Sequence, residues 1–279
     1  MTVSFYTLGC KVNQYESEAL GEIFESLGVS VVPISQSSDI IVVNSCTVTA
    51  ESNRKTRQTV RKLKKKSPNA FIVLTGCMAQ AFPKESTEIS EVDLIIGNTD
   101  YDKLPQAVLN AMNGCASRVL VSEHHKTYTD IGVTKMDEHT RAFIKIEDGC
   151  NRFCSYCIIP YARGRVRSRS LESIKKEAEA LAEKGYKEIV LVGINLSAFG
   201  SDTGLELCDA VEAVSSVEGI MRVRLGSLEC DQISDNALDR LSHNEKFCPQ
   251  FHLSLQSGCD KTLKEMNRKY DTAFYRDLV

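Results

Sequence analysis

Short apolar runs alternate with amphipathic helical patterns along the first 113 residues. The runs are rich in Val, Ile and Phe, as buried strands are. Because strands that alternate with helices form parallel sheets with right-handed crossovers, this part predicts an open parallel α/β sheet. Strands are expected at residues 3–8, 29–32, 39–43, 70–74 and 92–96, and helices at 13–27, 49–66 and 101–113.

A polar stretch interrupts this alternation, which then returns. Residues 122–141 lack a clear period, which predicts a linker over 115–140 with one short strand at 119–121. About four βα repeats follow, whereas a complete eight-unit barrel needs about 250 residues. We therefore expect a first domain at 1–114 and, at 141–279, a partial (incomplete) βα barrel. Its strands are expected at 142–146, 188–192, 221–225 and 250–255, and its helices at 171–184, 206–217, 235–242, near 259 and at 274–279.

Composition and charge exclude several classes of protein. The chain has 279 residues, a net charge of −3 and 42% apolar residues, which is ordinary globular usage and not that of a uniformly basic nucleic-acid binder. No apolar run approaches the roughly 20 residues of a membrane span, and the N-terminus does not read as a secretory signal. We expect a cytoplasmic protein with no membrane partner. Its eleven cysteines then indicate metal or redox chemistry, because cytoplasmic thiols stay reduced.

Three cysteines form a C-x3-C-x2-C motif directly after the strand expected at 142–146. Cys150, Cys154 and Cys157 place three thiolates in one loop, a ligand set for a tetrahedral zinc ion or an iron–sulfur cluster. Zinc requires a fourth protein ligand, and no His or Cys follows at finger spacing. Three thiolates on a four-iron cluster leave one iron open for a small molecule. We therefore favour a cluster over a degenerate zinc knuckle.

Three further cysteines follow strands of the N-terminal domain. Cys10, Cys46 and Cys77 each lie shortly past an expected strand. The space outside the carboxyl ends of a parallel sheet is a binding crevice, so these thiols could converge there on a second cluster. Buried cysteine is also common as a small hydrophobic residue. The pattern alone leaves both interpretations open.

Several motifs together resemble the radical S-adenosylmethionine methylthiotransferases over nearly the whole chain. They are YTLGCKVNQYESE, NSCTVT, TGCMAQ, GCNRFCSYCIIPYARGRVRSR, RLGSLE and HLSLQSGCD. The resemblance implies two 4Fe–4S clusters. The cluster that binds and cleaves S-adenosylmethionine would be held by Cys150, Cys154 and Cys157, and an auxiliary cluster by Cys10, Cys46 and Cys77.

The resemblance also implies a reaction and partners. Three of the motifs are most similar to bacterial members that convert N6-threonylcarbamoyladenosine, next to the tRNA anticodon, to its 2-methylthio derivative. A tRNA substrate and a low-potential electron donor such as flavodoxin or ferredoxin follow from this. Family members continue past the end of this chain, so a truncated enzyme is expected. The alternatives are methylthiolation of isopentenyladenosine in tRNA or of a ribosomal-protein aspartate, and an inactive iron–sulfur fragment.

Polar residues at the ends of the barrel strands are candidates for binding S-adenosylmethionine, although such a residue is as often a simple cap. The second strand end stands where relatives contact the methionine amino group. The third suits the ribose hydroxyls, and an aromatic residue in the cysteine loop is expected near the adenine. The candidates are Gly193 and Asn195 after the second strand, Ser227 and Glu229 after the third, Ser254 and Gln256 after the fourth, and Tyr156 in the loop.

Basic residues gather in two places. Residues 51–66 hold eight Lys or Arg against one Glu. Such a helix is usually a solvated face, but it could also follow an RNA backbone. After the cysteine motif, arginines recur with period two, and in an extended segment all would point the same way and favour weak contact with RNA phosphates. These are Arg163, Arg165, Arg167 and Arg169.

The other cysteines have no part in this scheme. Cys208 falls in a predicted helix and is expected to be a packing residue. Cys230 and Cys259 are expected to be free thiols at the rim of the barrel. Cys230 stands where the family usually has proline after SLE, which is expected to loosen the loop of Glu229. Cys115 and Cys248 receive no role.

Overall fold

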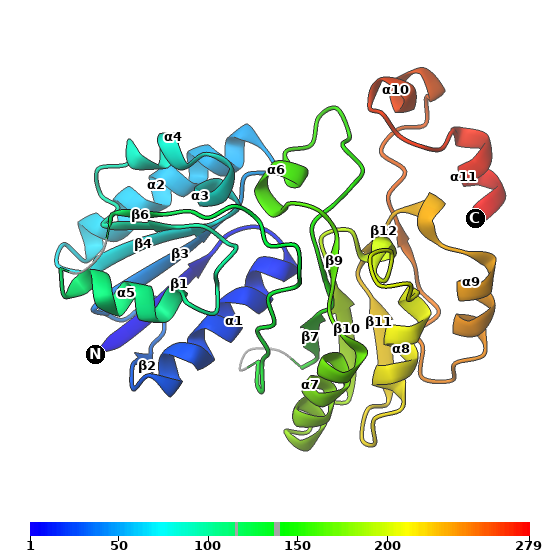
Figure 1. Cartoon of the computed structure of the whole chain (residues 1–279), viewed down its shortest axis with the longest axis horizontal. Helices are drawn as coiled ribbons and strands as arrows, with labels where there is room; N and C mark the ends of the chain where they lie inside the picture. Colours follow the sequence, from blue (N-terminus) through cyan, green and yellow to red (C-terminus); the bar gives the residue numbers. More distant parts are fainter. Residues whose placement is uncertain (115–116, 137–139) are drawn as a thin grey trace. The chain divides into compact units, whose positions relative to one another are not determined.

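A six-stranded sheet forms the centre of the first of two units into which the chain divides (Figure 1). This unit comprises Met1–His125, Thr129–Ile131 and Tyr161–Arg163, and the second comprises Lys126–Tyr128, Gly132–Pro160 and Gly164–Val279. The structure, a computed structural model, describes residues 1–114, 117–136 and 140–279. Cys115 and part of the predicted linker therefore lie outside the described residues.

All strand pairs of this sheet are parallel, and the strand order is β2-β1-β3-β4-β5-β6. Every residue of the central strand β3 is buried, as in a strand covered on both faces. The predicted parallel α/β sheet is thus confirmed. The strands are β1 (Thr2–Thr7), β2 (Ser30–Val31), β3 (Ile40–Ser45), β4 (Phe71–Gly76), β5 (Leu94–Ile96) and β6 (Val119–Leu120).

Helices cover both faces of the first sheet (Figure 1). On one face Val60, Leu63 and Met78 pack into a core with alternate residues of β3 and β4. Two short helices on this face have no counterpart in the sequence prediction, because five residues are too few to display a helical period. The helices are α1 (Lys11–Ser26) and α5 (Leu104–Met112) on one face, and α2 (Ala50–Lys66), α3 (Cys77–Ala81) and α4 (Pro83–Thr87) on the other.

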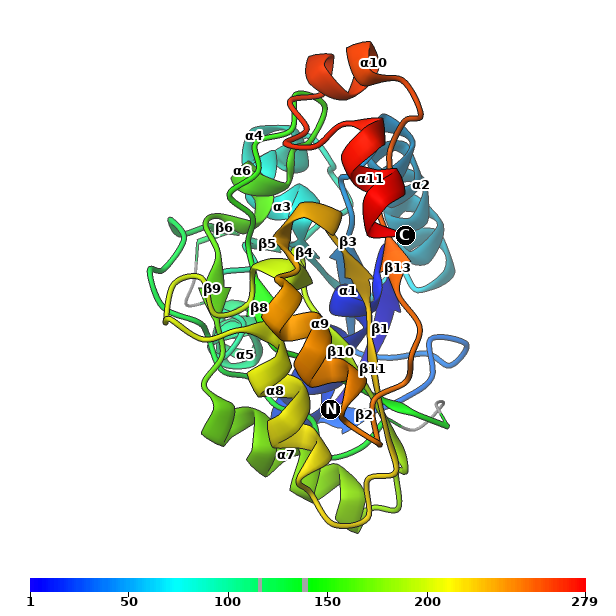
Figure 2. The same cartoon turned by 90° about the vertical axis from the view of Figure 1, so that its right-hand side faces the viewer.

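The second unit contains a parallel sheet in the order β11-β10-β7 and a separate parallel pair, β12 with β13. Helices α7, α8 and α9 alternate with these strands and pack beside one another (Figure 2). The predicted partial βα barrel is confirmed. Its elements are β7 (Ala142–Lys145), α7 (Leu171–Glu183), β10 (Glu188–Val192), α8 (Leu207–Ser215), β11 (Arg222–Leu225), β12 (Ser227–Leu228), α9 (Asp235–Ser242) and β13 (His252–Leu253).

The last two barrel strands differ from the prediction. The third strand breaks at Gly226, whose N–H bonds to Leu191 O on the neighbouring strand, and continues as β12. The fourth shrinks from six predicted residues to the two of β13. Before this strand, Pro249 has no N–H to donate, and the Gln250 N–H bonds locally to Cys248 O. A single bridge from Val223 to Phe247 precedes the proline.

Other elements surround the cysteine loop of the second unit. An antiparallel pair, β8 (Glu147–Asp148) with β9 (Arg167–Ser168), holds the base of the loop, and neither strand was predicted. Single-turn segments and short helices complete the chain. They are α6 (Ile159–Arg163), η1 (Leu196–Ala198), η2 (Cys230–Gln232), α10 (Asp260–Glu265) and α11 (Thr272–Leu278). No described helix has the length and hydropathy to span a bilayer.

Candidate functional site

Three cysteines lie at the carboxyl edge of the first sheet. Cys10 follows β1 and is the N-cap of α1, Cys46 follows β3, and Cys77 follows β4 as the first residue of α3. The strand order places the connections after β1 and β3 on opposite sides of the sheet, so the crevice between these strands is a topological switch point. Parallel sheets of this kind bind their ligands at that point.

Two observations show that these thiols are close to one another. A Cβ added to Gly9, next to Cys10, would come within 3.1 Å of the Cys46 Sγ. Burial raises the pKa of Cys77 to about 11, and the Arg163 guanidinium opposes this effect while Cys10 adds to it. The three thiols thus share one small region of the first unit.

The cysteine loop of the second unit is tightly folded. The Cys150 N–H donates to Gly164 O, and the Cys157 N–H donates to Cys154 O. Burial raises the pKa of Cys150 to about 11, and the nearby thiols of Cys154 and Cys157 contribute to the increase. Gly149 has a φ of +91°, and a Cβ there would lie 1.9 Å from Arg165 O. Only glycine therefore allows the chain to enter this loop.

An arginine from far along the chain reaches this loop. Arg268 donates from Nη1 to Cys154 Sγ at 3.2 Å and forms a buried ion pair with Glu229. Tyr156 is exposed, and the charges that act on its hydroxyl include those of Arg268 and Glu229. The structure thus brings Tyr156 and Glu229 to the cysteine loop. Sequence reasoning missed Arg268, because no motif or spacing links it to the cysteines.

The loop after β10 rests on a buried carboxyl group. Glu147 accepts the Asn195 N–H at 2.7 Å, and a Cβ on Gly193 would lie 2.7 Å from the same carboxylate oxygen. Burial raises the pKa of Glu147 well above its usual range. Asn195 donates to Gln232 at 2.9 Å, while its Oδ1 is buried and has no hydrogen-bond partner among the residues that the structure describes. An acceptor in this state is suited to a donor group of a ligand.

The other predicted strand-end residues lie near β12 and β13. The hydroxyl of Ser227 bonds to His252 at 3.0 Å, and the backbone of Ser254 bonds to Leu228. Gln256 is exposed and has a φ of +67°. Within the described part of the chain, no hydrogen bond or ion pair joins these three residues to the cysteine loop, so their predicted part in binding S-adenosylmethionine stays a prediction.

The expectation that four arginines point the same way is wrong. The segment is not extended, because Arg163 ends α6 and Gly164 turns the chain with a φ of +73°. Arg163 is fully buried against Glu16, Arg167 lies 3.6 Å from Asp148, and Arg169 pairs with Glu177. Burial of these guanidinium groups removes them from contact with RNA phosphates. Arg165 alone of the four is exposed.

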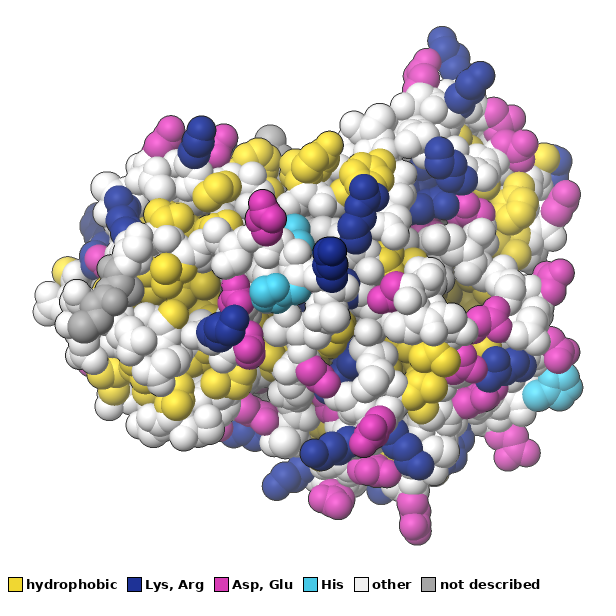
Figure 3. Space-filling view, in the orientation of Figure 1, with side chains coloured by type: hydrophobic (Ala, Val, Ile, Leu, Met, Phe, Trp, Pro, Cys, Tyr) yellow, Lys and Arg dark blue, Asp and Glu magenta, His cyan; other side chains and the backbone are white. Residues whose placement is uncertain are grey.

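The basic helix α2 is mostly solvated. Some of its charges pair with neighbouring acids, as Lys64 does with Asp93 and Arg61 with Glu91. The charged side chains of α7 are distributed differently from those of α2: Figure 3 shows acidic and basic side chains intermixed there. The exposure of α2 is consistent with the predicted solvated face. RNA contact by this helix stays a prediction.

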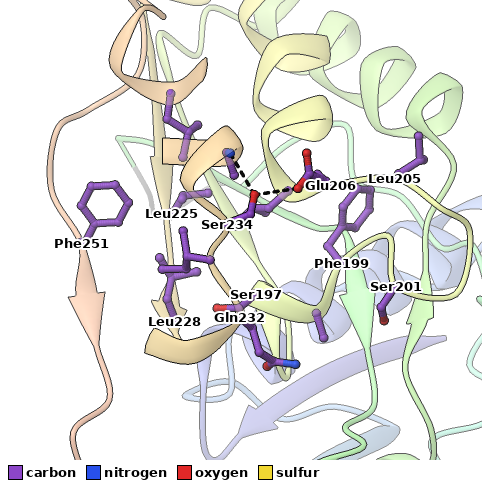
Figure 4. Close-up of a pocket in the computed structure, with 15 residues that line it drawn as sticks. Ser197, Phe199, Ser201, Leu205, Glu206, Leu225, Leu228, Gln232, Ser234 and Phe251 are labelled. Carbon is purple, nitrogen blue, oxygen red and sulfur yellow. Dashed lines mark hydrogen bonds between the residues drawn. The ribbon is translucent and has the colours of Figure 1, made fainter. Parts of the chain in front are cut away.

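A pocket of about 320 Å³ lies in the second unit between the strands and the helices that cover them (Figure 4). Most of its lining is apolar, and Ser234 donates to Glu206 at 2.7 Å on one wall. Gln232, which lines the pocket, also accepts a hydrogen bond from Asn195. Its described lining residues include neither the cysteines nor any predicted contact of S-adenosylmethionine.

Each cysteine group offers three thiols, the donor type that a 4Fe–4S cluster takes. Among the described residues, no three His, Cys, Asp or Glu side chains are close enough to hold one ion. A guanidinium 3.2 Å from one sulfur in each group also offsets the negative charge that thiolates carry.

Comparison with known families agrees with this division of the chain. Residues 2–97 match the family described as "Uncharacterized protein family UPF0004", and residues 144–279 match the radical SAM superfamily. The solved structure of the radical S-adenosylmethionine methyltransferase TsrM from Kitasatospora setae covers 99% of this chain and 66% of its own, with a TM-score of 0.69 and 14% identity. That likeness shows a shared fold.

Curated relatives align along the entire sequence. Threonylcarbamoyladenosine tRNA methylthiotransferases of Aquifex aeolicus and Bacillus subtilis are each 38% identical over 100% of this chain. The tRNA-2-methylthio-N(6)-dimethylallyladenosine synthase of Dictyoglomus thermophilum is 35% identical over 98%. The chain spans 68%, 62% and 63% of these relatives, respectively. The chain therefore belongs to the radical S-adenosylmethionine methylthiotransferase family.

Proposed function

We propose that the protein is a tRNA methylthiotransferase that converts N6-threonylcarbamoyladenosine to its 2-methylthio derivative. The observation that carries the proposal is the pair of cysteine trios, one in each unit, each with a buried arginine bonded to one sulfur. Cys150, Cys154 and Cys157 would hold one 4Fe–4S cluster. Cys10, Cys46 and Cys77 would hold the auxiliary one. When bound, the clusters and S-adenosylmethionine supply the electron, the radical and the sulfur chemistry.

The chain's own residues would position these groups. Asn195 offers a buried acceptor for the methionine ammonium group, and Glu147 holds the loop that presents it. Glu229 is oriented by Arg268, which fixes its second oxygen for a ribose hydroxyl. Arg152 pairs with Asp231 through two bonds of 2.8 and 2.7 Å and ties the cysteine loop to η2. A positioned site of this kind gains rate from orientation alone.

The substrate side of the proposal rests on the relatives. Three threonylcarbamoyladenosine enzymes are 38–39% identical to the chain and a fourth, of Chlamydia pneumoniae, is 34% identical, whereas the dimethylallyladenosine synthases are 34–35% identical. A base in the anticodon loop is single-stranded and enters a pocket without melting a duplex. A flavodoxin or ferredoxin is the expected electron donor, and the cytoplasm, where tRNA is found, the expected location.

The first test is metal content after anaerobic reconstitution. We expect about eight irons and as many sulfides per chain, and about four after replacement of Cys150, Cys154 and Cys157 by alanine. Electron paramagnetic resonance of the variant should report one remaining cluster. Zinc in place of iron, or loss of all iron in the variant, would overturn the proposal of two clusters.

The second test is product analysis. The reconstituted chain is incubated with S-adenosylmethionine, a reductant and tRNA carrying either threonylcarbamoyladenosine or isopentenyladenosine, and the nucleosides are separated by mass spectrometry. We expect a methylthio product from the first tRNA. Product only from the second tRNA, or only from a ribosomal protein, would replace the proposed substrate. Clusters without any product would favour an inactive iron–sulfur fragment.

A further inference from the structure

Arg163 is the largest fully buried side chain of the first unit, and its hydrogen-bond partners Glu16, Asn13 and Cys77 lie in that unit. Its Nη2 donates to Glu16 at 2.9 Å and to Asn13 at 2.8 Å, and its Nη1 also pairs with Glu16. Its Nε donates to Cys77 Sγ at 3.2 Å. One guanidinium thus joins a carboxylate, an amide and a thiol.

A buried ion pair is expensive to form. Arg163 and Glu16 are both 0% exposed, and removing two charges from water costs several kcal/mol that their attraction only partly offsets. Apolar residues of similar size are often as stable in such a position. Stability alone therefore does not explain why residue 163 carries a guanidinium group. The hydrogen bond from this group to a cysteine of the trio does explain it.

Asn13 extends the network to the other two cysteine loops. Its Nδ2 donates to Leu8 O and Ser45 O, which precede Cys10 and Cys46 respectively. Its Oδ1 accepts from Arg163 and lies 3.7 Å from the Cys10 Sγ. The Arg163–Asn13 bond therefore connects all three loops that carry the trio.

We propose that Arg163 is a positioning residue of the auxiliary cluster: it holds Cys77 toward the cluster and, through its hydrogen bond to that sulfur, raises the reduction potential of the cluster. This inference rests on the proposed function, since it takes Cys10, Cys46 and Cys77 as ligands. A donor and a positive charge beside a ligand sulfur stabilise the reduced, more negative state, which makes the potential more positive.

The test uses the full-length chain with Cys150, Cys154 and Cys157 replaced by alanine, so that only the auxiliary cluster contributes iron and signal. In this background Glu16→Gln is compared with Glu16→Gln/Arg163→Met. The two proteins differ only at residue 163, and the double variant leaves no buried carboxylate without its partner. The potential is measured by titration with dithionite, which adds one electron to the cluster, and is followed by electron paramagnetic resonance.

We expect the potential of the double variant to be more negative than that of Glu16→Gln. The matched control is Arg169→Gln/Glu177→Gln, which removes a buried ion pair of the second unit and should leave the potential unchanged. A folded double variant that retains no iron also supports the proposal, because Arg163 is then needed to hold the cluster. Equal potentials at full iron content would overturn it.

Two further outcomes keep the proposals separable. If the background protein itself binds no iron, the auxiliary cluster of the proposed function is wrong and the inference falls with it. If the double variant does not fold, Arg163→Lys is measured with Glu16 intact. That variant keeps the charge but loses the Nε donor, so a more negative potential or loss of iron supports the proposal and an unchanged potential contradicts it.

Discussion

At the residue scale, the glycines that precede some of the cysteines separate two kinds of Gly–Cys pair. A Cβ on Gly149 would clash with Arg165 O, and one on Gly76 would lie 2.4 Å from Ser45 O. By contrast, a Cβ on Gly258, before Cys259, would meet nothing within 4 Å. Crowding at the glycine thus marks cysteines of the two trios, where the backbone must pass close to another segment.

We expect Gly149→Ala to destabilise the second unit by about 3 kcal/mol, because it combines a positive φ with a backbone clash. Gly258→Ala is the matched control and should change stability by less than about 0.5 kcal/mol. Chemical denaturation followed by circular dichroism measures both. Equal effects of the two substitutions would show that the loop entrance is more adaptable than its geometry indicates.

A second residue-scale prediction concerns Asn195. Loss of its buried acceptor in Asn195→Ala should weaken binding of S-adenosylmethionine about tenfold, which corresponds to about 1.4 kcal/mol. The iron content should stay at the wild-type value. Calorimetry on the reconstituted protein measures the affinity, with Asn244→Ala as a control that removes an amide bonded to Ser215 instead. Unchanged affinity in Asn195→Ala would exclude this contact.

At the scale of elements, one carboxylate ties together three barrel strands. Glu188 begins β10 and pairs with Arg141, before β7, and with Arg222 and Arg224 of β11. Partial burial acts to raise the pKa of Glu188, but the hydrogen bonds and charges of these arginines outweigh it and lower that pKa below its ordinary value of 4.5. The ionised form is therefore the one that the folded state prefers.

This preference predicts a pH-dependent effect of Glu188→Gln. A lowered pKa in the folded state adds stability that is fully present above about pH 4.5 and is lost as the pH falls through the folded value. We expect the substitution to cost about 1 kcal/mol at pH 7 and progressively less toward pH 3. Urea midpoints at several pH values measure this. Glu183→Gln, at the exposed end of α7, should show no such trend.

At the scale of the whole molecule, the chain divides its chemistry between two units with different sheets. The first unit is an open parallel sheet whose trio lies at a switch point, and the second is a partial barrel whose trio lies in one loop. Each trio has its own buried arginine and carboxylate: Arg163 with Glu16, and Arg268 with Glu229. Each proposed cluster would therefore find its three thiols, an arginine and a carboxylate within a single unit.

Replacing Cys10, Cys46 and Cys77 by alanine should then separate two activities. We expect the variant to keep about four irons and to form 5′-deoxyadenosine from S-adenosylmethionine, but to make no methylthio nucleoside. Replacing Cys208, Cys248 and Cys259 instead removes as many thiols outside both trios, and about eight irons should remain. Chromatography of both products measures the outcome. Loss of 5′-deoxyadenosine in the first variant would mean that the two sites do not work independently.

The amino-acid sequence was sufficient to predict the parallel α/β class, the partial barrel and the candidate cysteines. These features are local: a buried strand appears as a continuous apolar run, and the C-x3-C-x2-C motif lies within eight residues. The sequence also contains a weaker signal of a buried polar network: Asn13 and Glu16 are polar residues on the buried face of an amphipathic helix. Such positions normally require a buried partner.

The partners of these residues follow from the fold and not from a pattern in the sequence. Arg163 meets Glu16 across 147 positions of the chain, and Arg268 meets Cys154 across 114. The same folding removed Arg167 and Arg169 from the surface on which their period-two spacing had placed them. A spacing rule describes neighbours along one element, whereas a buried charge is stabilised by whichever opposite charge the fold brings to it.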